Sequence, residues 1–165
     1  MALEPAITDV AQLKDRLVLA KLLASDSIAV EAVNFDRNEL SIWVPREHLV
    51  DAVRTLKEDA ELKFDFLSDV TCVDWYPSEP RFELSYHMLS MSRKERVRLK
   101  VKLGGDDAQI DSVFSVFPSC DYFEREVFDL FGVRFHGHPN LLRILMPEDW
   151  KGHPLRKDYP VEGYR

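Results

Sequence analysis

The sequence has few of the residues that several classes of function require. Its 165 residues include only two cysteines, Cys72 and Cys120, which do not form a C-x-x-C pair. This excludes a zinc ribbon, and also an iron–sulfur cluster held by this chain alone, which would need about four thiolates. We expect two reduced, mostly buried thiols. No apolar run approaches the roughly 20 residues of a membrane-spanning helix, so we expect no direct membrane span.

The sequence also lacks a basic excess and any phosphate-binding loop. It carries 22 Lys and Arg against 29 Asp and Glu, a formal net charge of -7. Proteins that follow a phosphate backbone are usually basic overall, so we predict no nucleic-acid partner. Neither G-x-G-x-x-G nor a Walker loop occurs, and nothing indicates nucleotide binding. Residues 1–6 contain no basic region, so we expect no secretory signal.

Hydrophobic periodicity predicts an α+β fold. Apolar residues at helical spacing predict four helices, at 9–24, 45–57, 110–117 and 121–131. Alternating or β-branched runs predict strands at 28–35, 40–44, 64–75, 81–88 and 96–103. The strict alternation in the last two strands predicts a sheet with one wet face. We therefore predict a mixed, largely antiparallel sheet covered by helices over residues 1–131.

The last 34 residues differ in character. They hold four of the nine prolines, four of the six glycines and three of the five histidines, without a helical or strand period. They also contain large apolar residues, too many for a solvated tail. We therefore predict that residues 132–165 form an extended C-terminal arm that packs on partner subunits and partly on its own domain. In the isolated chain we expect the arm to be loose.

A basic stripe and a group of histidines each allow two interpretations. The stripe comprises Arg93, Lys94, Arg96, Arg98, Lys100 and Lys102. The favoured interpretation is a solvated strand face, and the alternative is a docking surface for an acidic partner. His136, His138 and His153, with Glu148 and Asp149 between them, would serve a stand-alone metal-dependent enzyme. Their spacing matches no tight site, which favours ordered loop or interface histidines.

The helix at 121–131 carries several charges. Asp121 and Glu124 resemble a capping box, and Gly132 stands where a C-terminal cap belongs. Arg125 and Asp129 are i,i+4 partners, so we predict a salt-bridged helix surface. Glu124 and Glu126 point apart on a helix and are not an acid/base pair.

Two motifs near the C-terminus resemble those of a known family. The first, E-R-E-x-x-D-[LM]-F-G-[IV]-x-F-x-G-H-P-x-L-x-R-I-L, is similar to the run holding Glu124, Arg125, Glu126, Asp129, Leu130, Phe131, Gly132, Val133, Phe135, Gly137, His138, Pro139, Leu141, Arg143, Ile144 and Leu145. The second, G-x-P-L-R-K-D-[FY]-P, is similar to Gly152, Pro154, Leu155, Arg156, Lys157, Asp158, Tyr159 and Pro160. A weaker similarity, to L-S-D-V-T-x-V-D-W, lies at 67–75. On these motifs the chain resembles the 30 kDa subunit, or C subunit, of bacterial NADH:quinone oxidoreductase, respiratory complex I.

The resemblance implies a non-catalytic structural subunit of the peripheral arm of the proton-translocating complex. It implies no catalytic, cofactor-binding or metal-binding residue here, because FMN, the Fe–S clusters and quinone belong to partner subunits. The implied partners in this hetero-oligomer are the quinone-site subunit and the Fe–S subunits, on the cytoplasmic side of the cell membrane. The residues that the resemblance implies for the subunit interface are Glu124, Arg125, Glu126, Asp129, Gly132, Phe135, Gly137, His138, Pro139, Arg143, Trp150, Arg156, Lys157 and Asp158. We expect Phe135, Arg143, Trp150 and Arg156 to be its anchors.

Two features qualify the resemblance. Tyr122 and Phe123 stand where the family often has Trp before E-R-E, an aromatic exchange that leaves the assignment intact. The chain ends at Arg165, so we expect no fusion with the neighbouring subunit. The electron donor cannot be identified from these motifs. Equivalent scaffold subunits of a membrane-bound hydrogenase or of a ferredoxin-dependent complex are therefore the alternatives.

Overall fold

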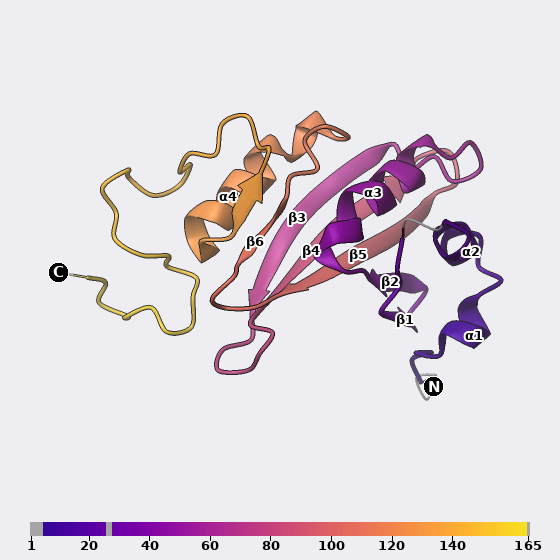
Figure 1. Cartoon of the computed structure of the whole chain (residues 1–165), viewed down its shortest axis with the longest axis horizontal. Coiled ribbons are helices and arrows are strands. Elements are labelled where there is room, and N and C mark those ends of the chain that lie inside the picture. Colours follow the sequence, from indigo (N-terminus) through magenta and orange to yellow (C-terminus); the bar gives the residue numbers. More distant parts are fainter. Residues whose placement is uncertain (1–4, 26–27, 165) are drawn as a thin grey trace.

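A computed structural model describes residues 5–25 and 28–164. In chain order its elements are α1 (Val10–Leu13), α2 (Leu17–Leu23), β1 (Ala32–Asp36), β2 (Glu39–Trp43), a 3₁₀ turn (Arg46–His48), α3 (Leu49–Glu58), β3 (Phe66–Asp74), β4 (Phe82–Ser90), β5 (Glu95–Leu103), β6 (Gln109–Asp111), a second 3₁₀ turn (Pro118–Cys120), α4 (Asp121–Phe131) and β7 (Arg134–His136) (Figure 1). In this part of the chain no helix is long and apolar enough to cross a bilayer.

A five-stranded sheet in the order β1-β2-β5-β4-β3 forms the centre of the fold. Three of its four pairings are antiparallel, and only β2 and β5 run parallel. This confirms the predicted α+β class with a mixed, largely antiparallel sheet. The alternation in β5 is confirmed too, because Val97, Leu99, Val101 and Leu103 are buried while the lysines and arginines between them are not.

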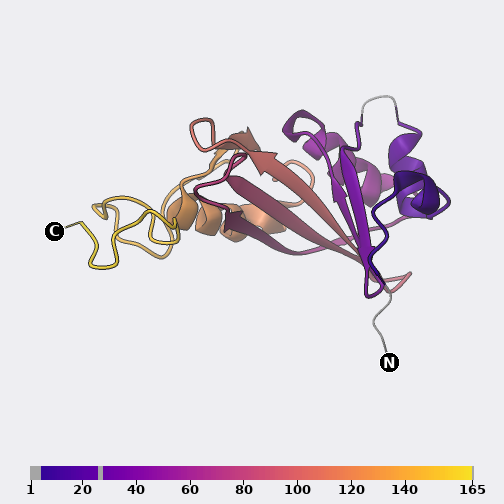
Figure 2. The same cartoon turned by 90° about the horizontal axis from the view of Figure 1, so that it is seen from below.

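The helices lie against this sheet because their apolar residues recur on one side. In α3, Leu49, Val53 and Leu56 are fully buried, and the helix lies in front of β4 and β5 (Figure 1). α4 contacts β3 at the other end of the sheet. The arm extends beyond α4, so the molecule is elongated with the arm at one end (Figure 2).

Two predicted helices are wrong. The helix expected at 9–24 is interrupted between Leu13 and Leu17, because Arg16 adopts an extended backbone with its guanidinium carbon 3.4 Å from the centroid of the Phe35 ring. The helix expected at 110–117 does not form. Residues 109–111 are instead β6, which pairs in parallel with β7 at 134–136. This partner lies far along the chain, so no local period reveals it.

Other boundaries differ by a few residues. β1 begins at Ala32 rather than at residue 28, and α3 is preceded by a 3₁₀ turn after Pro45. The first residues of the predicted arm belong to the core, since residues 134–136 form β7 and both Val133 and Phe135 are buried. The cap of α4 is as predicted: Gly132 has a left-handed φ of 77°, and a Cβ there would meet the side chains of His153 and Arg156.

Candidate functional site

The candidate site is the C-terminal arm and the residues that hold it. Asp129 on α4 is fully buried, and its carboxylate faces the arm. Oδ2 accepts hydrogen bonds from the backbone N–H groups of Ile144, Leu145 and Met146 at 2.8–3.0 Å. Oδ1 accepts from Arg143 Nη1 at 2.6 Å. The carboxylate of one helical residue therefore fixes the backbone of residues 144–146, which belong to no helix or strand.

These bonds determine the ionisation of Asp129. Burial acts to raise the pKa of its carboxyl, but the three backbone N–H donors and the Arg143 guanidinium outweigh burial and hold the pKa below its usual value. The predicted pairing of Asp129 with Arg125 is wrong. Arg125 instead donates to the carbonyl oxygens of Leu142 and Arg143, at 3.1 and 3.3 Å.

The arm also covers the C-terminal end of α4. Carbonyl groups of the last helical turn have no partner within a helix and carry partial negative charge. Here Arg156 Nε donates to the Phe131 carbonyl at 2.6 Å, and the Leu155 N–H donates to Leu130 at 3.1 Å. His153 Nδ1 donates to the Asp129 carbonyl at 2.9 Å. Cationic and backbone donors of the arm thus complete the helix end.

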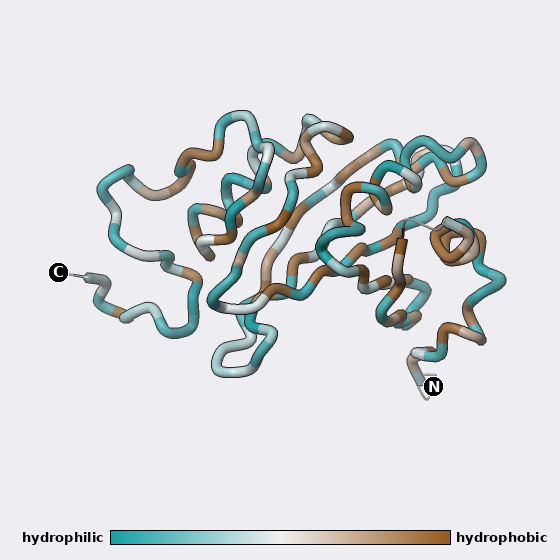
Figure 3. Tube along the Cα trace, in the orientation of Figure 1, coloured by the Kyte–Doolittle hydropathy of each residue, from teal (hydrophilic) through white to brown (hydrophobic). Residues whose placement is uncertain are grey.

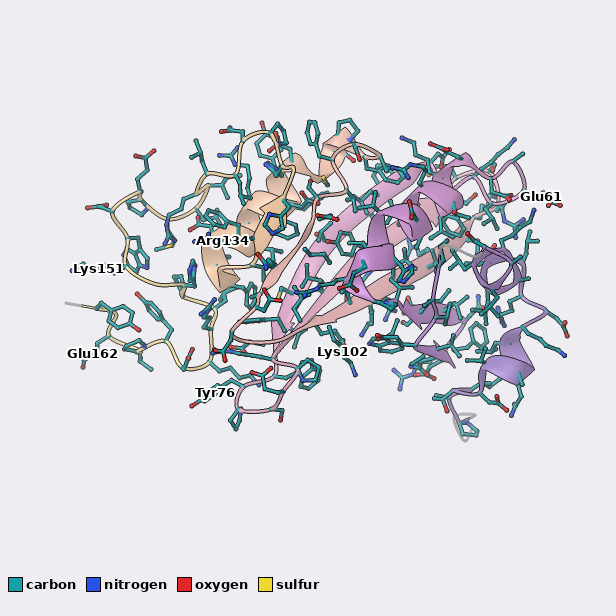
Figure 4. The ribbon with its side chains drawn as sticks, in the orientation of Figure 1. Glu61, Tyr76, Lys102, Arg134, Lys151 and Glu162 are labelled. Atoms are coloured by element: carbon teal, nitrogen blue, oxygen red, sulfur yellow. The ribbon has the colours of Figure 1, made fainter. Side chains whose placement is uncertain are left out.

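A second buried cluster joins the arm to the sheet. Arg81, at the start of β4, donates to Asp74 through Nε and Nη2 at 2.9 and 2.8 Å. The same guanidinium donates to both carboxylate oxygens of Asp158 at 3.0 and 2.6 Å. The Lys157 N–H adds a bond to Asp74 at 2.8 Å. Figure 4 labels Tyr76 on the adjacent β3–β4 loop and Lys151 and Glu162 on the arm.

Burial opposes the ionisation of Asp74, but the bonds from Arg81 and from the backbone N–H groups of Lys157 and Tyr76 lower its pKa to about 2. The cluster therefore stays ionised at neutral pH. Bidentate arginine–carboxylate pairs of this kind fix geometry as well as charge. The residues 156–158 consequently have a defined position on the sheet.

A third buried carboxylate, that of Glu124, lies in the first turn of α4. Its side chain is fully buried, and it accepts from Ser112 Oγ at 2.5 Å and from the Val113 N–H at 2.9 Å. Burial raises the pKa of this carboxyl above its usual value. The predicted capping box is wrong, because Glu124 binds the β6–α4 connection rather than its own helix, and no side chain caps that helix.

The arm also exposes several large apolar side chains. Six large side chains there and on α4 are between 38% and 64% exposed: Tyr122, Leu142, Leu145, Trp150, Leu155 and Tyr164. Figure 3 shows hydrophobic positions interspersed along this segment. Scattered exposed apolar residues are normal, but a series on one irregular, pinned segment indicates an interaction site.

The predicted interface residues divide into buried and exposed positions. Asp129, Arg143, Arg156 and Asp158 hold the arm from within, and Trp150 is exposed on it. Phe135 is 3% exposed in this chain's own core, so it has no surface to offer as an anchor. Glu126, Gly137, Pro139 and Lys157 have exposed or partly exposed positions, and Gly137 has a left-handed φ of 76°.

The three tail histidines do not converge. His136 lies on β7 beside Gln109, the His138 ring is buried near Asp121, and His153 caps α4. The described residues contain no group of three or more His, Cys, Asp or Glu side chains placed to hold a metal ion.

Sequence reasoning missed Asp74 and Arg81, although Asp74 lies in the weaker motif at 67–75. The signal available in the sequence was the position of Asp74, a charged residue at the end of a largely apolar strand. The arm residues that bind Asp74 and Arg81 lie about 80 positions further along the chain, so only the fold identifies them.

The geometry defines a class of protein: an α+β domain with an irregular C-terminal segment held to it by buried charges. Comparison with known proteins identifies the family. The family described as the 30 Kd subunit of the respiratory-chain NADH dehydrogenase matches residues 42–165. The C subunit of NADH-quinone oxidoreductase from Saccharopolyspora erythraea is 47% identical over 82% of this chain and 55% of that protein. The corresponding protein of Roseiflexus sp. strain RS-1 is 44% identical over 90% of this chain and 86% of that protein.

Two solved structures are similar as well. A trypsin-resistant fragment of Nqo5 has a TM-score of 0.63 and 28% identity, covering 75% of this chain and 96% of that one. A chain of the membrane-bound sulfane sulfur reductase, an archaeal respiratory membrane complex, has a TM-score of 0.72 and 25% identity, covering 93% of this chain and 87% of that one. The chain therefore belongs to the 30 kDa subunit family of NADH-quinone oxidoreductase. This subunit is a non-catalytic part of the complex, whose cofactors lie in other subunits.

Proposed function

We propose that this chain is a structural subunit that positions its neighbours in the peripheral arm of NADH:quinone oxidoreductase. The observation that carries the proposal is that a segment whose backbone is fixed from within exposes several large apolar side chains. Asp129 and the Arg81 cluster hold the arm from inside, while Leu142, Leu145 and Trp150 face outward. An interface ordered before binding loses less conformational entropy when its partner arrives.

The proposed partners are the quinone-site subunit and the Fe–S subunits. The complex would lie on the cytoplasmic side of the cell membrane. The role of the chain is geometric, since electron transfer between fixed centres requires the subunits that carry them to be held rigidly. The predicted interface residues divide accordingly: the buried charges shape the arm, and the exposed apolar side chains contact the partner.

The test compares two exposed leucines. Leu145→Asp places a charge on the arm, and Leu23→Asp makes the same change on α2, where Leu23 is 46% exposed. We expect Leu145→Asp to deplete the chain from the large band that oxidises NADH in native electrophoresis, and Leu23→Asp to leave that band intact. Equal incorporation of both variants contradicts arm docking. A cross-linker at position 145 should reach the quinone-site subunit, and capture of a different subunit would correct the partner.

The similarity to the archaeal respiratory complex favours a second candidate. In that case the chain is an equivalent scaffold in a membrane-bound complex fed by another donor. A large band that contains the chain but does not oxidise NADH would support this alternative.

A further inference from the structure

The turns of the β1–β2 and β4–β5 hairpins lie at the end of the molecule away from the arm (Figure 2). The parallel pairing of β2 with β5 begins only at Leu40 and Val97. The β1–β2 hairpin continues beyond this point to Asp36 and Glu39, and the β4–β5 hairpin continues to Ser90 and Glu95. A groove of about 770 Å³ opens between the two turns. We call it the hairpin groove.

The hairpin groove is basic although the protein is acidic. Its cationic lining residues are Arg16, Arg37, Arg93, Lys94 and Arg96, and its only acidic ones among the described residues are Glu39 and Glu95. The whole chain has a formal net charge of -7. A recess lined by one sign of charge raises the local concentration of ligands of opposite charge.

Both glutamates of the groove already have partners. Glu95 binds Arg93, with 2.7 Å between Oε2 and Nη2, and Glu39 is paired with Arg98. Lys94 and Arg96 are exposed, and neither forms an ion pair with any residue in the described part of the chain. Two cations therefore remain available to an anionic ligand.

The groove also offers apolar contacts and an open strand edge. Met91, at the β4–β5 turn, is 60% exposed, and Leu40 and Leu89 line the floor. The groove continues into a second hollow of about 460 Å³ on the outer face of the sheet, which includes half-exposed Phe66. Residues 95–96 of β5 have no β2 partner, so an extended chain could add main-chain hydrogen bonds there.

These features favour a peptide over other anions. A small phosphate would leave Met91 and Phe66 unused. A membrane surface is flat and suits cations on a protrusion, whereas these cations line a recess. Nucleic acid would need stacking rings, and the Phe35 ring in the groove is covered by Arg16.

We propose that the hairpin groove binds an extended acidic segment of a partner protein, with aliphatic side chains of that segment against Met91 and Phe66. The proposal is independent of arm docking, because it concerns the opposite side of the chain. A subunit with both surfaces would bridge two partners.

Fluorescence anisotropy of the full chain tests this with a labelled peptide in which pairs of glutamates alternate with leucine. The variants are Arg96→Glu and Lys102→Glu. Both residues are exposed on β5 and carry the same charge change, but Lys102, labelled in Figure 4, lies outside the groove. We expect Arg96→Glu to weaken binding about tenfold, since reversal replaces an attraction by a repulsion of similar size, and Lys102→Glu to weaken it less than about twofold.

Further outcomes decide between the ligand classes. Met91→Asp should weaken the Glu/Leu peptide more than an all-glutamate peptide. Equal weakening by Arg96→Glu and Lys102→Glu would show a net-charge effect and overturn the site. So would absence of peptide binding, or binding only to phosphatidylglycerol vesicles. In the assembled complex, a photo-cross-linker at position 91 should capture a segment rich in Asp and Glu, and capture of lipid or of this chain alone would overturn the proposal.

Discussion

The anchoring of the arm by Asp129 can be tested by Asp129→Asn. The carboxylate accepts four hydrogen bonds, three from backbone N–H groups and one from Arg143. Asparagine keeps one oxygen and places an NH₂ group where a second acceptor stood, so at least one donor loses its partner. The remaining bonds lose their charge assistance, which makes them roughly half as strong. Together these changes should cost about 3–4 kcal/mol.

The loss should be local, because the bonds join the arm to α4 rather than core to core. We expect hydrogen exchange at the backbone N–H groups of residues 144–146 to accelerate about 10²- to 10³-fold, the factor that corresponds to about 3–4 kcal/mol. Trypsin should also cleave faster at Lys151, which is exposed on the arm. Glu126→Gln is the matched control, an exposed carboxylate on the same helix.

Unchanged protection at residues 144–146 in Asp129→Asn would refute the anchoring role. Parallel loss of protection throughout the chain would show instead that the arm and residues 1–131 unfold as one unit. The wild-type chain in the same assay tests whether the isolated arm is loose. The sequence favours looseness and the intrachain bonds favour order, so this expectation remains a prediction.

Three more predictions follow from buried polar groups. Glu124→Gln should keep both contacts, since its amide oxygen can accept from the Val113 N–H while its NH₂ group donates to Ser112 Oγ. It should unfold within about 1 kcal/mol of wild type at low pH. Because the folded pKa of Glu124 is raised, wild-type stability should fall relative to this variant as pH rises above about 4.5, and parallel urea-denaturation curves from pH 4 to 8 would contradict this. Tyr86→Phe should be neutral or stabilising by up to about 1 kcal/mol in thermal unfolding, since the buried hydroxyl has no partner among the described residues. Asp74, with its lowered pKa, contributes stability above pH 3.8 that is lost as pH falls toward 2, so Asp74→Asn should lessen the acid sensitivity measured by circular dichroism.

Local patterns predicted the five strands of the main sheet and two of the four helices. The alternation of β5, the apolar side of α3 and the glycine cap of α4 depend on neighbouring residues, and each was confirmed. The wet face predicted for β4 was wrong, because its polar residues Glu83 and Ser85 are buried as well. The motifs around Asp129 and Arg156 identified the family because they are long and specific. The large apolar residues of the arm favoured a segment that binds a partner, because side chains such as Leu145 and Trp150 are unfavourable in a fully solvated tail.

The roles of the charged residues were decided by the tertiary structure. Arg125 and Asp129 have ideal helical spacing for an ion pair, yet each binds the arm. The buried carboxylate gains more from three backbone donors and Arg143 than it would from Arg125 alone. The β6–β7 pairing and the contact of Arg81 with Asp158 join residues distant in sequence. The sequence by itself determined the five strands of the main sheet, the helices α3 and α4, and the family. Only the fold determined what holds that arm in place, because its hydrogen bonds depend on long-range proximity that no local period encodes.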